Sequence, residues 1–103
     1  MITHNVIFSW HFGVSSDQIE GLRQALNQMV EEISADMTAE QAGVFSISHG
    51  PDLRFRDGNG DYALVATFID RAAWDAYQAD PRHKAFVRDF VTPLAATRFA
   101  IQF

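Results

Sequence analysis

The chain has 103 residues, which suits one domain and leaves no room for two, so we expect a single domain over residues 1–103. Hydrophobic residues make up 48% of the chain, which favours a packed core over disorder. The net charge is −5 and the eight Lys and Arg are scattered, so there is no basic stripe for nucleic acid and little attraction to an anionic membrane.

The absence of cysteine excludes disulfides, thiolate metal sites and thiol nucleophiles. Residues Met1–Asn5 carry neither a basic segment nor a long apolar one, and no apolar run approaches the roughly 20 residues that span a bilayer. We therefore expect a cytoplasmic protein. No Gly-rich phosphate loop, haem motif or flavin fingerprint is visible, so no cofactor is predicted.

The N-terminal part of the chain has the patterns of a strand and then a helix. Residues Ile2 to Phe12 alternate with a period of two, which predicts a strand that ends at Gly13. Ser15 and Gln18 then have the spacing of a capping box. Apolar residues recur at steps of three and four as far as Ile33, which predicts an amphipathic helix. The strand face that we expect to point toward the helices carries Ile2, His4, Val6, Phe8, Trp10 and Phe12.

The middle of the chain has the patterns of two further strands. The first is predicted over Gly43–His49 and is followed by a loop rich in turn formers from Gly50 to Asp61. Within this loop, Asp57–Asp61 imitates a calcium loop but lacks the Gly and Glu required further along. We interpret it as a hairpin turn with Asn59-Gly60, and no metal site is predicted. Tyr62–Ile69 is a nearly continuous apolar run, typical of a central strand.

The last third of the chain predicts two short helices and a strand. Asp70 is expected to cap a helix that carries Tyr77 and that is interrupted at Asp80-Pro81. A short helix restarts there and ends near Pro93, and residues Thr97–Phe103 alternate as a last strand. The order βαββαβ is the pattern of ferredoxin-like folds, so we expect an α+β fold with an antiparallel four-stranded sheet.

The strand predicted over Tyr62–Ile69 is apolar on both of its faces. Helices in ferredoxin-like folds cover only one face of the sheet, so the other would expose a larger apolar patch than monomers usually tolerate. A second copy of the same sheet is the simplest cover, through an isologous two-fold contact. We therefore predict a homodimer that closes an α+β barrel.

Met1–Phe8, Asp61–Asp70 and Ala76–Val87 together resemble the stress-responsive dimeric A/B barrel family. The first segment resembles the family's opening strand, which typically starts with a His at the place of His4. The second resembles its third strand. The third resembles its signature, an aromatic residue followed by a Pro-x-His turn and an apolar helix. The resemblance covers nearly the whole chain and implies a ferredoxin-like barrel dimer, but fold does not supply function.

His83 is the first candidate for proton-transfer chemistry. With Asp80 as N-cap and Pro81 at the first helical position, His83 falls at the third, where the helix N-terminus favours a neutral imidazole. A neutral imidazole can accept a proton. Tyr77 precedes the break and His4 lies on the inward strand face, so we expect the three side chains to converge on an apolar pocket between sheet and helices. The pocket is predicted to include Val6, Phe8, Trp10, Asp80 and Phe86.

The resemblance implies roles for these residues, because the family includes a plant polyketide cyclase. In that enzyme a His matching His83 is the catalytic base, a Tyr matching Tyr77 orients the substrate, and a His matching His4 lies nearby. The base removes a proton next to a carbonyl, which requires a base with a pKa near ambient pH and a hydroxyl donor for the enolate. At Asp80 the enzyme has another His, so the present chain has an added carboxylate near the site.

Each of these residues also has a purely structural interpretation, with His83 and Tyr77 in helix packing and His4 as a satisfied buried histidine. Three functions therefore stay open. The first is a small-molecule binder or an enzyme of cyclase, isomerase or lyase type. The second is a non-catalytic stress-response or oligomerisation domain, and the third is a cofactor-free monooxygenase or muconolactone isomerase-like enzyme. Alanine at His83 separates them, since only the enzymes would lose turnover in a folded dimer.

Overall fold

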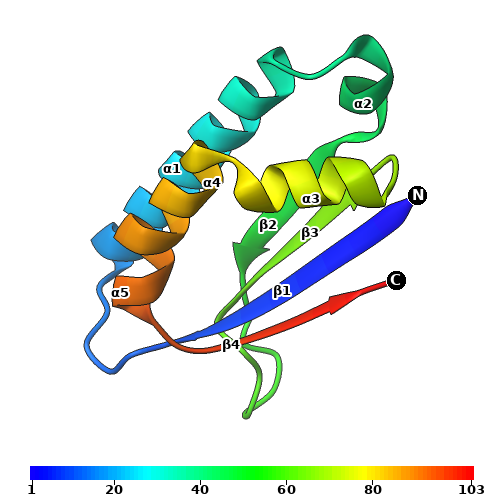
Figure 1. Ribbon diagram of the computed structural model, residues 1–103. Coiled ribbons are helices and arrows are strands. Elements are labelled where there is room, and N and C mark those ends of the chain that lie inside the picture. Colours follow the sequence, from blue (N-terminus) through cyan, green and yellow to red (C-terminus); the bar gives the residue numbers. More distant parts are fainter.

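The computed structural model describes residues 1–103 and has four strands and several helices. The strands form one antiparallel sheet in the order β2-β3-β1-β4, and the helices gather on one side of it (Figure 1). The predicted ferredoxin-like α+β fold is confirmed. The elements in chain order are β1 (Ile2–Trp10), α1 (Ser16–Ala35), α2 (Ala39–Val44), β2 (Ser46–Pro51), β3 (Tyr62–Phe68), α3 (Arg71–Ala79), α4 (Pro81–Phe86), a π-helical turn η1 (Val87–Val91), α5 (Thr92–Leu94) and β4 (Ala95–Gln102).

The core lies between the sheet and the helices, as the period-two pattern of the first strand predicts. Val6 and Phe8 of β1 are buried, and they pair across the sheet with Leu64 and Tyr62 of β3. Helix α1 begins with the predicted capping box, in which the Ser15 hydroxyl accepts from the Gln18 N–H at 3.1 Å. The apolar stripe of α1 covers these strands through Leu22, Leu26, Met29 and Ile33.

Strand β1 ends two residues earlier than expected. Its pairing with β4 shifts between Ser9 and Trp10, and the Trp10 N–H donates to an Asp61 carboxylate oxygen at 2.7 Å instead of continuing the ladder. The following chain turns through Gly13, whose φ of 86° is readily adopted only by glycine. Phe12 therefore lies outside the strand and is fully exposed.

The predicted bounds of the second strand are wrong at both ends. Gly43 and Val44 belong to helix α2, which begins with a capping box between Thr38 and Gln41 that the sequence interpretation overlooked. At the other end, β2 continues through Gly50-Pro51. Proline is tolerated there because β2 is an edge strand.

The hairpin turn with Asn59-Gly60 is also wrong. A two-residue turn of that kind needs positive φ at both residues, but positive φ occurs at Gly58 and Arg54 instead. The connection between β2 and β3 is a longer loop, in which the Arg54 guanidinium pairs with Asp61 at 2.5 Å. This loop exposes two large apolar side chains, Leu53 and Phe55.

The helical segment after β3 bends at the predicted break. Asp70 caps α3 by accepting from the Ala73 N–H, and Asp80 ends α3 and caps α4. Farther along, the Thr92 N–H donates to the Val87 carbonyl five residues back, which widens the helix into η1 next to Pro93. The chain then enters β4 at Ala95, two residues earlier than expected.

The face of the sheet opposite the helices carries an uncovered apolar patch, although polar residues such as Asn5 also lie on that face. Ile7, Val65, Phe99 and Ile101 lie on it with exposed fractions of 47%, 40%, 71% and 63%. They form one patch because Ile7 pairs with Phe99, and Asn5 pairs with both Val65 and Ile101. None of the helices combines the length and the hydropathy needed to cross a bilayer.

Candidate functional site

A cavity of about 310 Å³ lies between the sheet and the second helical segment. Such a volume is at the small end of the range for ligand pockets. It brings together the three candidate residues His4, Tyr77 and His83 with the predicted lining residues Val6, Phe8 and Phe86. The remaining lining residues are Leu64, Trp74, Gln78, Val87, Val91, Arg98, Ala100 and Gln102.

The cavity lies beside the break at Asp80-Pro81. Because Pro81 starts a new helix with its own cap, α3 and α4 are separate helices, and Tyr77 and His83 are contributed by different ones. Figure 1 shows the α3–α4 segment on the helical side of the sheet, with β1 and β4 beneath it. The inward-facing β4 residues are exposed, so the cavity opens along that edge strand.

His83 occupies the third position of α4, next to the ring of Tyr77. The ring centroids are 4.3 Å apart and the Nδ1 atom of His83 is buried without a hydrogen-bond partner. Burial lowers the pKa of His83 below its ordinary value, the charges of His4 and Arg98 act in the same direction, and the Gln78 backbone and the Asp80 carboxylate oppose them. The neutral imidazole expected from the sequence thus owes its state mainly to burial.

Tyr77 is buried in the wall of the same cavity and keeps its proton. Burial raises the pKa of the Tyr77 hydroxyl well above its usual range, and the Asp80 carboxylate adds to the effect. Its ring also packs against Phe68 and Phe45 of the core, with centroids 5.1 and 6.1 Å away. Tyr77 therefore combines a packing role with a hydroxyl that remains a proton donor at neutral pH.

His4 is buried at the centre of the sheet, and its tautomer follows from its partners. The Trp74 indole N–H points to His4 Nδ1 at 3.3 Å, and the Gln102 amide nitrogen lies 2.9 Å from the same atom. An indole N–H only donates, so Nδ1 is an acceptor and the proton resides on Nε2. Burial lowers the pKa of His4, which keeps the ring neutral.

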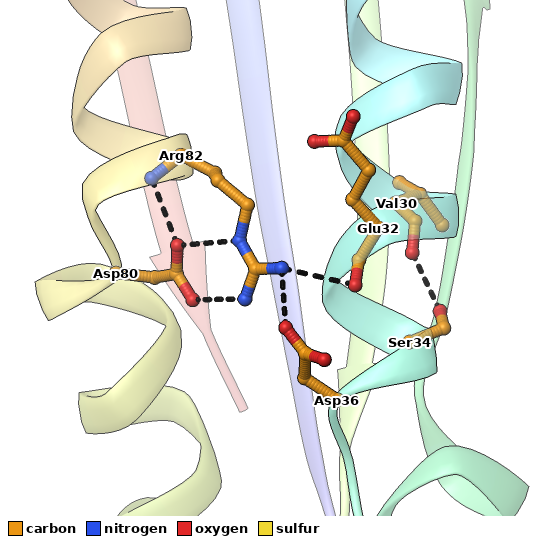
Figure 2. Close-up of polar contacts among 6 residues, drawn as sticks. All are labelled: Val30, Glu32, Ser34, Asp36, Asp80 and Arg82. Atoms are coloured by element: carbon orange, nitrogen blue, oxygen red, sulfur yellow. Dashed lines mark hydrogen bonds and ion pairs between the residues drawn. The ribbon is translucent and has the colours of Figure 1, made fainter.

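Asp80 lies outside this cavity, contrary to the prediction. Its carboxylate accepts from the Arg82 N–H at 2.8 Å and from the Arg82 guanidinium at 3.0 and 2.9 Å. Figure 2 shows the same guanidinium reaching Asp36 and the Glu32 carbonyl at the end of α1. Asp80 thus caps α4, and through Arg82 it links α4 to the end of α1. The sequence interpretation did not consider this link.

Trp10 also lies outside the cavity. Its ring stacks on Phe8 with centroids 5.9 Å apart and contacts Tyr62 at 5.8 Å. The shift in register between Ser9 and Trp10 interrupts the pairing that would have continued the inward face. The side chain is a packing element beyond the end of the cavity.

Four lining residues with polar side-chain groups, Trp74, Gln78, Arg98 and Gln102, were missed as site residues. Arg98 and Gln102 lie opposite Phe8 and His4 in the pairing of β1 with β4, and Trp74 precedes Tyr77 by one helical turn. The alternation of residues 98, 100 and 102 places them on one strand face, which was a detectable signal. The lining contains two imidazoles and a guanidinium but no carboxylate.

No cluster of three or more His, Asp or Glu side chains is positioned to hold a metal ion. His49 belongs to β2, where its ring lies 2.7 Å from the Tyr62 hydroxyl and 2.6 Å from the Asn27 side-chain oxygen. This network ties α1 to the sheet. The imidazoles, the phenol and the guanidinium in the cavity lining can exchange protons and hydrogen bonds with a small molecule.

The family model of the stress-responsive A/B barrel domain matches residues 2–103. No protein with a curated description matches the chain. Among solved structures, a dimeric ferredoxin-like protein of unknown function from Thermobifida fusca YX is 32% identical, with a TM-score of 0.83 over 99% of this chain and 88% of the other.

Two more distant structures are similar in fold. A ferredoxin-like protein of the same family from Mesorhizobium loti is 22% identical, with a TM-score of 0.68 over 99% of this chain and 93% of the other. A hydroxynitrile lyase from Passiflora edulis is 18% identical, with a TM-score of 0.77 over 99% and 90%. At these identities the likeness shows the fold alone.

Proposed function

Since the chain belongs to the stress-responsive A/B barrel domain family, we propose that its cavity binds a small aromatic ligand and performs cyclase-, isomerase- or lyase-like proton transfer. The observation that carries the proposal is the set of His4, Tyr77 and His83 in the wall of one largely apolar cavity. One of the proteins with a similar fold is a hydroxynitrile lyase, which is an enzyme of the lyase type included in this proposal.

The proposed roles follow from the protonation states. His83, whose lowered pKa keeps its imidazole neutral, removes a proton from a carbon next to a carbonyl, and the electron pair moves to the carbonyl oxygen. The Tyr77 hydroxyl, which stays protonated, donates to the enolate oxygen. His4 carries its proton on Nε2 and supplies a second donor. The protonated His83 then returns its proton to the product, so the cycle needs no cofactor.

The exchange of deuterium into phenylacetone tests this proposal directly. Its benzylic protons flank a carbonyl, and its ten non-hydrogen atoms suit a cavity with room for about ten water molecules. In D2O, the protein should accelerate their exchange roughly a hundredfold over free imidazole at the same concentration, as followed by proton NMR. His83→Ala should lower the exchange rate to that of free imidazole. Lys84 is an exposed neighbour on α4, and Lys84→Ala should leave the rate unchanged.

Binding is measured independently through the two tryptophans. Trp74 lines the cavity and Trp10 does not, so phenylacetone should change the fluorescence of Trp10→Phe, which retains Trp74, and leave that of Trp74→Phe unchanged. The absence of both a fluorescence change and excess exchange would overturn the proposed function. Binding without exchange would overturn its catalytic part.

A second proposal is that the uncovered face of the sheet joins two copies of the chain. The patch of Ile7, Val65, Phe99 and Ile101 is apolar and exposed, and self-complementary contact by two-fold symmetry would bury it. The similar Thermobifida fusca protein is itself described as dimeric. The cavity lies on the other face of the sheet, so each cavity of the proposed dimer would be lined by residues of a single chain.

A further inference from the structure

We infer that Arg98 makes the cavity selective for ligands that carry a carboxylate, with a monocyclic aromatic acid as the class that fits. This inference rests on the proposed function, since it names the ligands of the same cavity. Arg98 extends that proposal because a guanidinium adds anion recognition to an otherwise neutral proton-transfer site.

The position of Arg98 is set by strand pairing. It lies opposite Phe8 in the register of β1 with β4, on the strand face that also carries Ala100 and Gln102. This is the inward face, and all three residues line the cavity. Ala100 has only a methyl group, which leaves space between the two longer side chains. Arg98 and His83 both line the cavity, and the charge of Arg98 contributes to lowering the pKa of His83.

Arg98 differs from most cations of this chain in having no carboxylate partner. Five other arginines form ion pairs, namely Arg23, Arg54, Arg71, Arg82 and Arg88. No acidic residue lines the cavity, although the chain has thirteen Asp and Glu. Arg98 is exposed, so its guanidinium keeps its hydrogen-bond donors available at the open edge of a cavity whose lining holds no competing anion.

The charge and size of the site favour a carboxylate over a phosphate. A single guanidinium matches one carboxylate with two parallel hydrogen bonds, and the lining provides no second Arg and no Lys for a dianion. Phe8 lies beside Arg98, and Phe86, Val87 and Val91 supply apolar surface for a ring. The volume of about 310 Å³ corresponds to about ten water molecules, which is the scale of one ring with a short acid side chain.

Phenylacetate and phenylacetamide test the inference, because they have the same shape and differ in charge. NMR titration of the full-length protein should show phenylacetate binding at least tenfold more tightly than the amide. Arg98→Gln should reduce this preference to near one and leave the affinity for the amide unchanged. Arg56→Gln, which removes an exposed arginine of the β2–β3 loop, should retain the full preference.

In the NMR spectrum of Arg98→Gln, unchanged resonances of residues distant from the cavity would verify that the variant is folded. Equal binding of the two probes by the unaltered protein would overturn the inference, and so would a preference that survives in Arg98→Gln. If phenylacetone binds and phenylacetate binds no more tightly than phenylacetamide, only the proposed role of Arg98 fails. If none of the three probes binds, the proposed function fails with it.

Discussion

The ring of Tyr77 lies against the imidazole of His83, with centroids 4.3 Å apart and planes inclined by 43°. The two residues belong to the last turn of α3 and the first turn of α4, so their contact spans the break at Asp80-Pro81. The break therefore changes the direction of the helical segment and also positions these two side chains. It places a buried hydroxyl and a neutral imidazole side by side in the wall of one cavity.

Replacing Tyr77 with Phe separates the packing role of this ring from the role of its hydroxyl. The ring contacts to His83 and Phe68 are retained, so stability should change little. The rate of phenylacetone exchange should fall by roughly tenfold to a hundredfold, because the enolate loses a hydrogen bond. The affinity for phenylacetone, measured by Trp74 fluorescence, should stay the same. An unchanged exchange rate would show that the hydroxyl has no part in the reaction.

The pH dependence of exchange should report the protonation of His83. Neutral imidazole is the active form, and its fraction grows as the pH rises through the pKa. Burial lowers this pKa below the ordinary 6.5, so the midpoint of the rise in activity should lie under pH 6.5. Because the pKa of Tyr77 is raised, the plateau should continue into the alkaline range. A midpoint above 6.5 would contradict the assignment of His83 as the base.

The tautomer of His4 is open to direct observation. Nitrogen NMR of protein labelled at histidine should show an unprotonated, pyridine-type Nδ1 and a protonated Nε2 for this residue at neutral pH, because Nδ1 accepts from Trp74 and Gln102. Trp74→Phe removes one donor and should shift the Nδ1 resonance without reversing the tautomer. A proton on Nδ1 in the unaltered protein would contradict the hydrogen bonding described for His4.

Asp80 should matter for stability rather than for binding. Asp80→Ala removes the cap of α4 and the main partner of Arg82, and loss of a cap alone costs about 1 kcal/mol of unfolding free energy. Urea denaturation should detect this loss, while the affinity for phenylacetone should be unaffected. The matched control is Asp75→Ala, which removes an exposed partner of Arg71 and should leave the urea midpoint nearly unchanged. A loss of binding in Asp80→Ala at full stability would assign Asp80 to the site.

A charge at the centre of the exposed sheet face should prevent association. Val65→Asp and Ile101→Glu each place a carboxylate in the apolar patch, where burial against a second copy would be unfavourable. Light scattering should show a dimer for the unaltered protein and a monomer for each variant. Ala72→Glu, on the exposed side of α3, should remain dimeric. A monomeric unaltered protein at micromolar concentration would overturn the proposed interface.

Sequence patterns predicted the order of the elements because each pattern is local. Alternation along β1, the capping box at Ser15 and the break at Asp80-Pro81 each involve residues within a few positions of one another. Errors arose where a local signal was missed or overridden. The capping box at Thr38 was overlooked, and edge position in the sheet made Pro51 acceptable as a strand residue.

Sequence by itself therefore determined the fold class and placed Tyr77 and His83 at the helix break, since the cap and the proline that define it are adjacent in the chain. Only the tertiary structure decided which side chains share the cavity. Arg98 enters it and Trp10 does not because of the register between β1 and β4, which are separated by almost the whole chain. Asp80 is directed away because Arg82 links it to the end of α1, a contact that exists only after the helices pack.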